Sequence, residues 1–111
     1  MNMQTAVDLI KQFEPKYEDT YLEAKLKEIA CDLRSLVRVK LTTKQHTALL
    51  SLIEDIGIYE FTNAKILEFI NKENFILASA QFSNYAKIGR VNSIRKVKRR
   101  MTERKLFMDK E

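Results

Sequence analysis

Apolar residues recur three or four positions apart along most of this chain, which is the spacing of one face of an α-helix. The longest such stripe lies between residues 21 and 37 and consists of Leu22, Leu26, Ile29, Leu33, Leu36 and Val37. A shorter stripe precedes it and consists of Met3, Ala6, Val7, Ile10 and Phe13. Pro15 disfavours helical geometry at Glu14, so the first helix is expected to end there. The pattern therefore predicts two amphipathic helices before residue 40.

A third helix is predicted to begin after Thr42. Thr42 and Gln45 have the spacing of a capping box, in which the hydroxyl accepts from the Gln45 amide and the Gln45 side chain reaches back. Gly57 can adopt the left-handed conformation that commonly ends a helix. The residues expected to face inward from this helix are Ala48, Leu49, Leu52, Ile53 and Ile56.

Three more helices are predicted, over about 62–72, 74–88 and 92–109. Two glycines and one proline among 111 residues leave little material for hairpins or long loops. A hydrophobic content of 45% with 32% charged residues is ordinary for a folded globular chain. We therefore expect an all-α fold, a compact bundle of about six helices that forms a single domain over residues 1–111.

The same composition bears on location. No apolar stretch approaches the roughly 18 residues that a membrane span needs. The first residues alternate polar and apolar positions and lack the basic region of a secretory signal. Cys31 is the only cysteine, which excludes an internal disulfide, and its place on a helix predicts a small packed side chain. The expected location is the cytoplasm.

Five segments, taken in order, carry recognisable motifs: DLIKQFE (8–14), LTTKQHTALLSLIEDIG (41–57), FTNAKILEFIN (61–71), ASAQFSNY (78–85) and RRMTERKLF (99–107). Together they resemble the helices of phage-type lysozymes, which are the phage endolysins of glycoside hydrolase family 24. Asp55 stands where that family has Asn, and Tyr85 stands where it has Trp. The resemblance covers nearly the whole chain and implies the helical lobe of the lysozyme fold.

In the resembled family the first helix leads into a catalytic glutamate, and Glu14 holds that position here. A glycine-rich β-hairpin follows there at once and carries an Asp or Cys and then a Thr. The corresponding positions in this chain are Glu23 and Ile29, which both fall within the helical stripe. No glycine occurs before Gly57, so we predict no β-hairpin between residues 15 and 40.

A glycosidase needs two carboxyl groups placed across the scissile bond. Glu14 is the only candidate at the family's acid position, and without an opposing hairpin we expect it to be vestigial, a helix-end carboxylate that packs or forms an ion pair. Asp19 and Thr20 have suitable chemistry but lie too near, on a segment with no glycine to shape a turn. His46 is the only histidine, so neither a catalytic triad nor a histidine-rich metal site can form. No cofactor and no metal are expected.

Positive charge is concentrated near the C-terminus. Residues 87–105 hold nine Lys or Arg and one acid, although the net charge of the whole chain is only +5. On a helix, Ile94, Val97, Met101 and Met108 share one narrow face, and basic residues cover most of the rest. Such a face can bind nucleic acid, anionic lipid or an acidic protein surface. The candidate binding residues are Arg95, Lys96, Lys98, Arg99, Arg100, Arg104 and Lys105. The resemblance implies that Arg99, Arg100 and Glu103 are also partly structural.

These observations favour a catalytically inactive, lysozyme-derived phage or prophage protein that acts by binding. It would inhibit or modulate a host system through its basic C-terminal helix, with an acidic protein surface or a nucleic acid as partner. One alternative is a minimal muramidase that cleaves peptidoglycan with Glu14 as general acid, aided by Glu18 or Asp19. The other is a protein that binds peptidoglycan without cleaving it.

Overall fold

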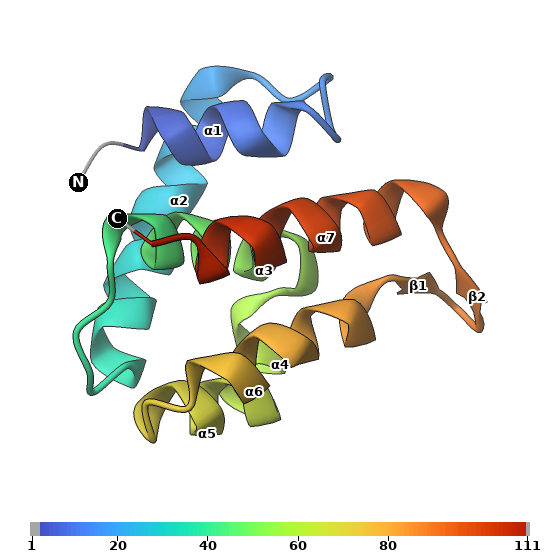
Figure 1. Ribbon diagram of the computed structural model, residues 1–111. Helices are drawn as coiled ribbons and strands as arrows, with labels where there is room; N and C mark the ends of the chain where they lie inside the picture. Colours follow the sequence, from blue (N-terminus) through green and yellow to red (C-terminus); the bar gives the residue numbers. More distant parts are fainter. Residues whose placement is uncertain (1–2, 111) are drawn as a thin grey trace.

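The computed structural model describes residues 3–110, which are mostly helical (Figure 1). A short 3₁₀-helix, η1 (Gln81–Tyr85), and one antiparallel hairpin, β1 (Lys87–Ile88) with β2 (Val91–Asn92), interrupt the helices. The α-helices are α1 (Gln4–Lys11), α2 (Asp19–Leu36), α3 (Thr43–Ile56), α4 (Ile58–Thr62), α5 (Lys65–Asn71), α6 (Phe75–Ala80) and α7 (Ile94–Met108). The predicted all-α class is therefore confirmed.

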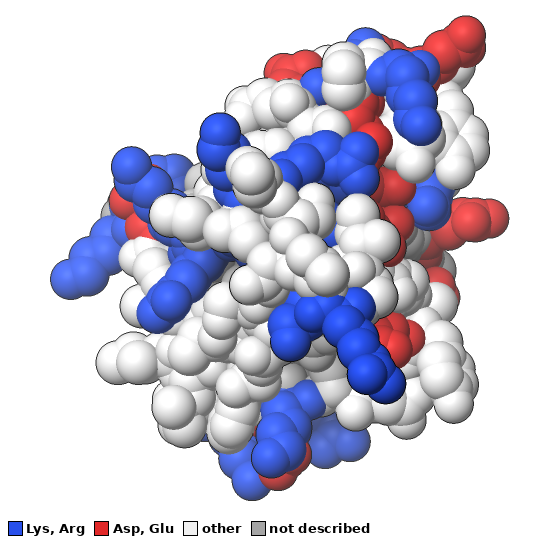
Figure 2. All heavy atoms as spheres, turned by 90° about the vertical axis from the view of Figure 1, so that its right-hand side faces the viewer, with Lys and Arg blue, Asp and Glu red and all other residues white. Residues whose placement is uncertain are grey.

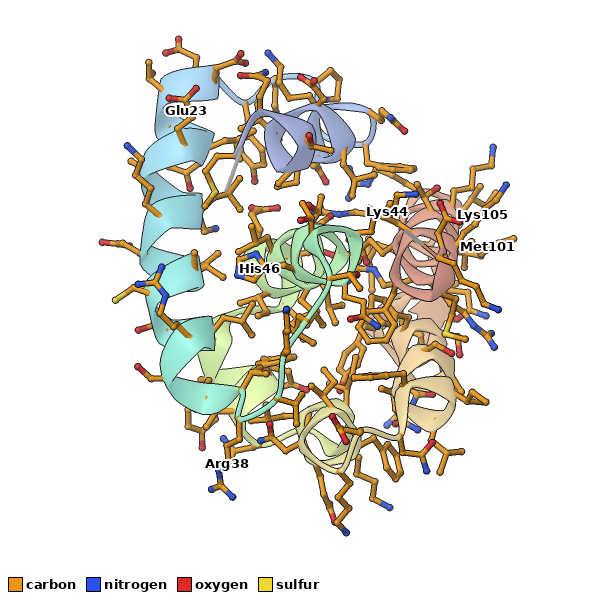
Figure 3. All side chains as sticks on the ribbon, turned by 60° about the vertical axis from the view of Figure 1, so that its left-hand side comes forward. Glu23, Arg38, Lys44, His46, Met101 and Lys105 are labelled. Atoms are coloured by element: carbon orange, nitrogen blue, oxygen red, sulfur yellow. The ribbon has the colours of Figure 1, made fainter. Side chains whose placement is uncertain are left out.

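Helix α3 is the centre of the fold. All eight residues from Thr47 to Glu54 are buried, which requires neighbours on every side of the helix. Those neighbours are α1, α2 and α7; Figure 1 shows α7 in front of α3, and Figure 3 shows α3 between α2 and α7. The core around α3 is completed by apolar side chains of α1, α2, α4, α5, α6 and η1.

The predicted capping box at the start of α3 is confirmed. The Thr42 hydroxyl accepts from the Gln45 amide at 3.1 Å, and the Gln45 side chain accepts from the Thr42 amide at 2.9 Å. Gly57 ends the helix with a φ of +90°, a conformation that favours glycine. Its ψ of 153° is extended, so Gly57 does not have the full left-handed helical geometry that was expected.

Helix boundaries differ from the predictions at the end of α1 and over residues 74–88. Helix α1 ends at Lys11, and the chain continues as hydrogen-bonded turns in which the Glu14 amide still donates to Ile10. The segment predicted as one helix over 74–88 contains α6, η1 and the first strand. The strands are only two residues long, too short to produce an alternating pattern, and Gly89 turns between them at a φ of +63°.

The interval from residue 15 to residue 40 contains no strand, as predicted, and α2 runs through most of it. Cys31 on this helix is exposed, so the expectation of a packed side chain was wrong. None of the helices in the described part of the chain is both long and apolar enough to cross a membrane.

Helix α7 buries charge rather than its apolar stripe. Arg99 and Arg100 are only 2% and 1% exposed, and Glu103 is fully buried beside them. By contrast, Ile94 and Met101 point away from the core and are largely exposed. The prediction that Arg99 and Arg100 belong to an exposed binding face is therefore corrected, because their guanidinium groups lie in the interior.

Candidate functional site

Glu14 lies in the turn between α1 and α2, and its side chain is mostly buried, at 13% exposure. One carboxylate oxygen lies 3.4 Å from Nη1 of Arg95, in the first turn of α7. Within residues 3–110 this is the only ion pair that Glu14 makes. The residue at the family's acid position thus links the first helical segment to the last helix.

The other acids suggested by the sequence do not face Glu14 from a hairpin. Asp19 pairs with Lys11 at 2.6 Å, and Glu18 is an exposed residue at the start of α2. Glu23 lies one turn into the same helix, where Figure 3 labels it. Ile29, at the position of the family's Thr, is buried in the core. Within residues 3–110, no paired strands carry a second carboxylate opposite Glu14.

A different carboxylate, that of Glu54 on α3, shares an environment with Glu14 through Tyr17. The pKa of Tyr17 is raised by the charge of Glu54, by burial and by the charge of Glu14. Glu54 is itself buried, and it accepts hydrogen bonds from Arg99 at 2.8 Å and from Lys25 at 3.2 Å. Because both of its oxygens are held within the protein, Glu54 is poorly placed to act on a substrate.

Arg99 is the centre of a buried charge cluster, which we define as Glu54, Asp55, Arg99, Arg100 and Glu103. Its Nη2 donates to the Ser51 carbonyl at 2.7 Å as well as to Glu54, and its Nε donates to Glu103 at 3.2 Å. The Ser51 hydroxyl also donates to Glu103. These contacts hold α7 against α3 through hydrogen bonds between opposite charges, which are stronger than neutral ones.

Arg100 extends the buried charge cluster toward the surface. Its Nη2 donates to Asp55 at 2.6 Å, and its Nε lies 3.1 Å from Glu103. Asp55 also accepts from Lys96 at 3.0 Å. Lys96, predicted to be a free binding residue, is therefore partly buried and already paired within the chain.

The cluster shifts the pKa values of Asp55 and Glu103 in opposite directions. Burial acts to raise the pKa of Asp55, but Arg99, the Lys96 hydrogen bond and Arg100 together outweigh it and lower that pKa. For Glu103 burial is the stronger influence, and its pKa is raised despite Arg100, Arg99 and Ser51. The ionised carboxylate of Asp55 therefore stabilises the folded protein.

We expect Asp55→Asn to make the free energy of unfolding depend less on pH in the acidic range. The pKa of Asp55 in the folded protein lies below its ordinary value of 3.8, so its carboxylate stabilises the fold above about pH 4. That contribution is lost as the pH falls through the folded pKa. Urea unfolding between about pH 6 and pH 3 should show the parent and Asp55→Asn converging in stability toward low pH. A difference that stays constant with pH would contradict this assignment.

The predicted basic face is reduced by these contacts. Of the seven candidate residues, Arg99 and Arg100 are buried, while Arg95 and Lys96 pair with acids of the same chain. Those that are exposed and have no ion pair with a described residue are Lys98, Arg104 and Lys105. Figure 3 shows Lys105 and Met101 pointing outward from α7.

The hairpin carries surface residues that were not predicted from the sequence. Lys87 and Arg90 are exposed there and have no ion pair with any residue between 3 and 110. Ile88 and Val91 are also exposed on the same two strands. The available signal was the glycine between two β-branched residues, Ile88-Gly89-Arg90-Val91, which is compatible with a tight hairpin.

His46, in the first turn of α3, is partly buried. It lies between α3 and α2 (Figure 3), and burial together with the charge of Arg34 lowers its pKa. Its Nδ1 is buried without a hydrogen-bond partner among the described residues. Within residues 3–110 there is no cluster of three His, Cys, Asp or Glu side chains that could hold a metal ion.

Comparisons with known proteins agree with this architecture. The sequence profile described as Phage lysozyme matches residues 3–103. The endolysin of Acyrthosiphon pisum secondary endosymbiont phage 1 is 31% identical over 94 residues, covering 80% of this chain. The endolysin of Salmonella phage P22 is 38% identical over 76 residues, covering 68% of it. The aligned regions span only 64% and 51% of those two relatives.

Two solved structures show the same fold. The muramidase domain of SpmX from Asticaccaulis excentricus aligns with a TM-score of 0.85 and 23% identity, over 96% of each chain. An endolysin from Escherichia coli O157:H7 phage FAHEc1 aligns with a TM-score of 0.77 and 21% identity, over 81% of this chain and 60% of that one. On the family match and on its helical architecture, this chain belongs to the phage lysozyme family.

Proposed function

We propose that this member of the phage lysozyme family does not cleave glycan and acts by binding an anionic target. The observation that carries the proposal is the environment of Glu14. Its carboxylate is mostly buried and paired with Arg95, and the following segment forms α2 instead of a hairpin. A general acid has to reach the glycosidic oxygen, and a second carboxylate has to reach the opposite side of the sugar. The arrangement around Glu14 supplies neither condition.

We propose an anionic target because several cations of α7 and the hairpin form no ion pair with an acid of the described chain. The cations of α7 and the hairpin that have no ion pair within residues 3–110 are Lys87, Arg90, Lys98, Arg104 and Lys105. The only acid between residues 81 and 108 is Glu103, which is fully buried. This surface therefore attracts negative charge over a range of about 8 Å at physiological salt. An acidic protein surface, a nucleic acid and an anionic envelope component all have the required charge.

The first test is a cell-wall assay with the purified chain. We expect no loss of turbidity from outer-membrane-permeabilised Gram-negative cells and no release of reducing ends from purified peptidoglycan sacculi. An active endolysin is the positive control. Clearing by this chain that disappears in Glu14→Gln would overturn the proposed lack of cleavage.

Arg95→Ala sharpens this test. If the ion pair alone silenced Glu14, removing the guanidinium would produce activity. We expect Arg95→Ala to remain inactive, because it restores neither the hairpin nor a second carboxylate. Arg95 is half exposed, so the variant should fold normally, which circular dichroism can verify.

The muramidase alternative has one observation in its favour. The solved muramidase domain of SpmX aligns over 96% of both chains, so a domain of nearly the same length carries that name. The sacculus assay decides between cleavage and its absence. Co-sedimentation with the same sacculi tests the third alternative: retention without released sugar would identify peptidoglycan as the bound target.

A further inference from the structure

The hairpin and the outer side of α7 together form a surface on which large apolar side chains are exposed. Ile88, Val91, Ile94 and Met101 are between 57% and 76% exposed. A hollow of about 250 Å³ lies beside α7, where Met101 of that helix, Ser83 of η1 and Asn92 of β2 are among its lining residues. The hairpin therefore lies next to α7, and Ile94 follows it in the first turn of that helix.

Cations accompany these apolar residues. Lys87 and Arg90 lie on the hairpin, and Lys98 and Arg104 lie on α7. Figure 2 shows this side of the molecule, where uncharged side chains occupy the middle, several Lys and Arg side chains lie around them, and Asp and Glu side chains lie along the right-hand part of the view. We call the eight residues the apolar–basic surface: Lys87, Ile88, Arg90, Val91, Ile94, Lys98, Met101 and Arg104.

We propose that the apolar–basic surface docks on an anionic phospholipid bilayer, with Ile88, Val91 and Ile94 entering the interfacial layer. Interfacial binding needs exposed apolar side chains flanked by Lys or Arg, because the apolar groups enter the lipid while the cations meet phosphate headgroups. The hairpin forms the right-hand extremity of the molecule in Figure 1, so its side chains can reach a flat surface. The chain would lie on the membrane without crossing it.

Other occupants fit the same surface less well. A second copy in a two-fold contact would bring identical positive surfaces together, which is unfavourable. A nucleic acid would use the cations but leave the four apolar side chains without a role, and no aromatic residue accompanies them for base stacking. A bilayer uses both kinds of side chain. This inference rests on the binding part of the proposed function and holds whether or not Glu14 is catalytic, so the two tests fail independently.

The test is flotation of the full chain with vesicles. We expect binding to vesicles of phosphatidylglycerol and phosphatidylethanolamine, weakening with added salt, and little binding to phosphatidylcholine alone. Ile88→Ser with Val91→Ser should weaken binding by at least about tenfold, since two large side chains lose their burial. Lys87→Gln with Arg90→Gln should weaken it by a similar factor of about ten.

A matched control uses exposed apolar residues outside the surface. Ile76 and Leu77 on α6 are 72% and 45% exposed, beside Lys72, which is already paired with Glu68. Ile76→Ser with Leu77→Ser should bind vesicles as the parent does. Equal loss in this control, equal binding to phosphatidylcholine, or no binding to the anionic vesicles would overturn the proposal.

A fluorescent reporter tests insertion directly. The chain contains no tryptophan, so Val91→Trp introduces a single indole at the hairpin. Its emission should shift to shorter wavelength with anionic vesicles, while Ile76→Trp should show no shift. If anionic vesicles leave the emission of Val91→Trp unchanged, the hairpin does not enter the bilayer and the proposal is wrong.

Discussion

Replacing Arg99 with methionine should lower the free energy of unfolding by about 3–5 kcal/mol. The substitution removes the cation that lies between Glu54 and Glu103, at 2.8 and 3.2 Å, and leaves both buried carboxylates less well compensated. A domain of this size has a total stability of about 5–15 kcal/mol, so the variant should unfold at clearly lower temperature and urea concentration. Urea unfolding followed by circular dichroism measures the difference.

Arg104→Met is the matched control for this prediction. Arg104 lies on the same helix but is exposed and has no ion pair with a described residue, so its replacement should change stability by about 0.5 kcal/mol or less. Adding Glu103→Leu to Arg99→Met should recover part of the loss, because it removes one of the uncompensated charges. Equal small effects of Arg99→Met and Arg104→Met would show that the buried charge cluster does not hold α7.

Replacing Phe107 with alanine should also cost about 3–5 kcal/mol. Phe107 is 1% exposed, and its ring lies 6.1 Å from that of Phe75 and 5.5 Å from that of Phe82. It therefore attaches the end of α7 to α6 and η1, and its removal leaves a cavity among aromatic rings. Urea unfolding again provides the measurement.

The neighbouring residue supplies the control for Phe107. Met108 is partly exposed and lies outside the core, so Met108→Ala should change stability much less. If Phe107→Ala and Met108→Ala had the same effect, the aromatic contacts between α7 and α6 would not contribute to the stability of the fold.

Much of the fold was predictable from local pattern. The apolar stripe of α2 and the capping box of α3 depend on residues within a few positions of one another, and both predictions are confirmed. The hairpin was missed because a strand of two residues has no periodicity to detect. One helix was expected over 74–88 because a short 3₁₀-helix and a two-residue strand do not interrupt the spacing of the apolar residues enough to be detected.

The site was less accessible to sequence reasoning because its contacts join distant segments. The resemblance placed Glu14 at the family's acid position, but its pairing with Arg95 depends on how α7 packs. The burial of Arg99 and Arg100 also requires knowing that α3 presents two acids at the point where α7 crosses it. Helical periodicity assumes that the apolar stripe is the inward one, and in α7 that assumption is wrong.

The inward charges of α7 have a consequence for how this helix can evolve. In an ordinary amphipathic helix the same apolar residues stabilise the fold and limit what the surface can carry. Here the rotational setting of α7 is specified by ion pairs together with Phe107 at its end, since turning the helix by one residue would separate Arg99 and Arg100 from Glu54 and Asp55. The outward positions, Ile94 and Met101 among them, are therefore not needed to pack the core. Substitutions at those positions can therefore change what the surface binds while the orientation of the helix is preserved.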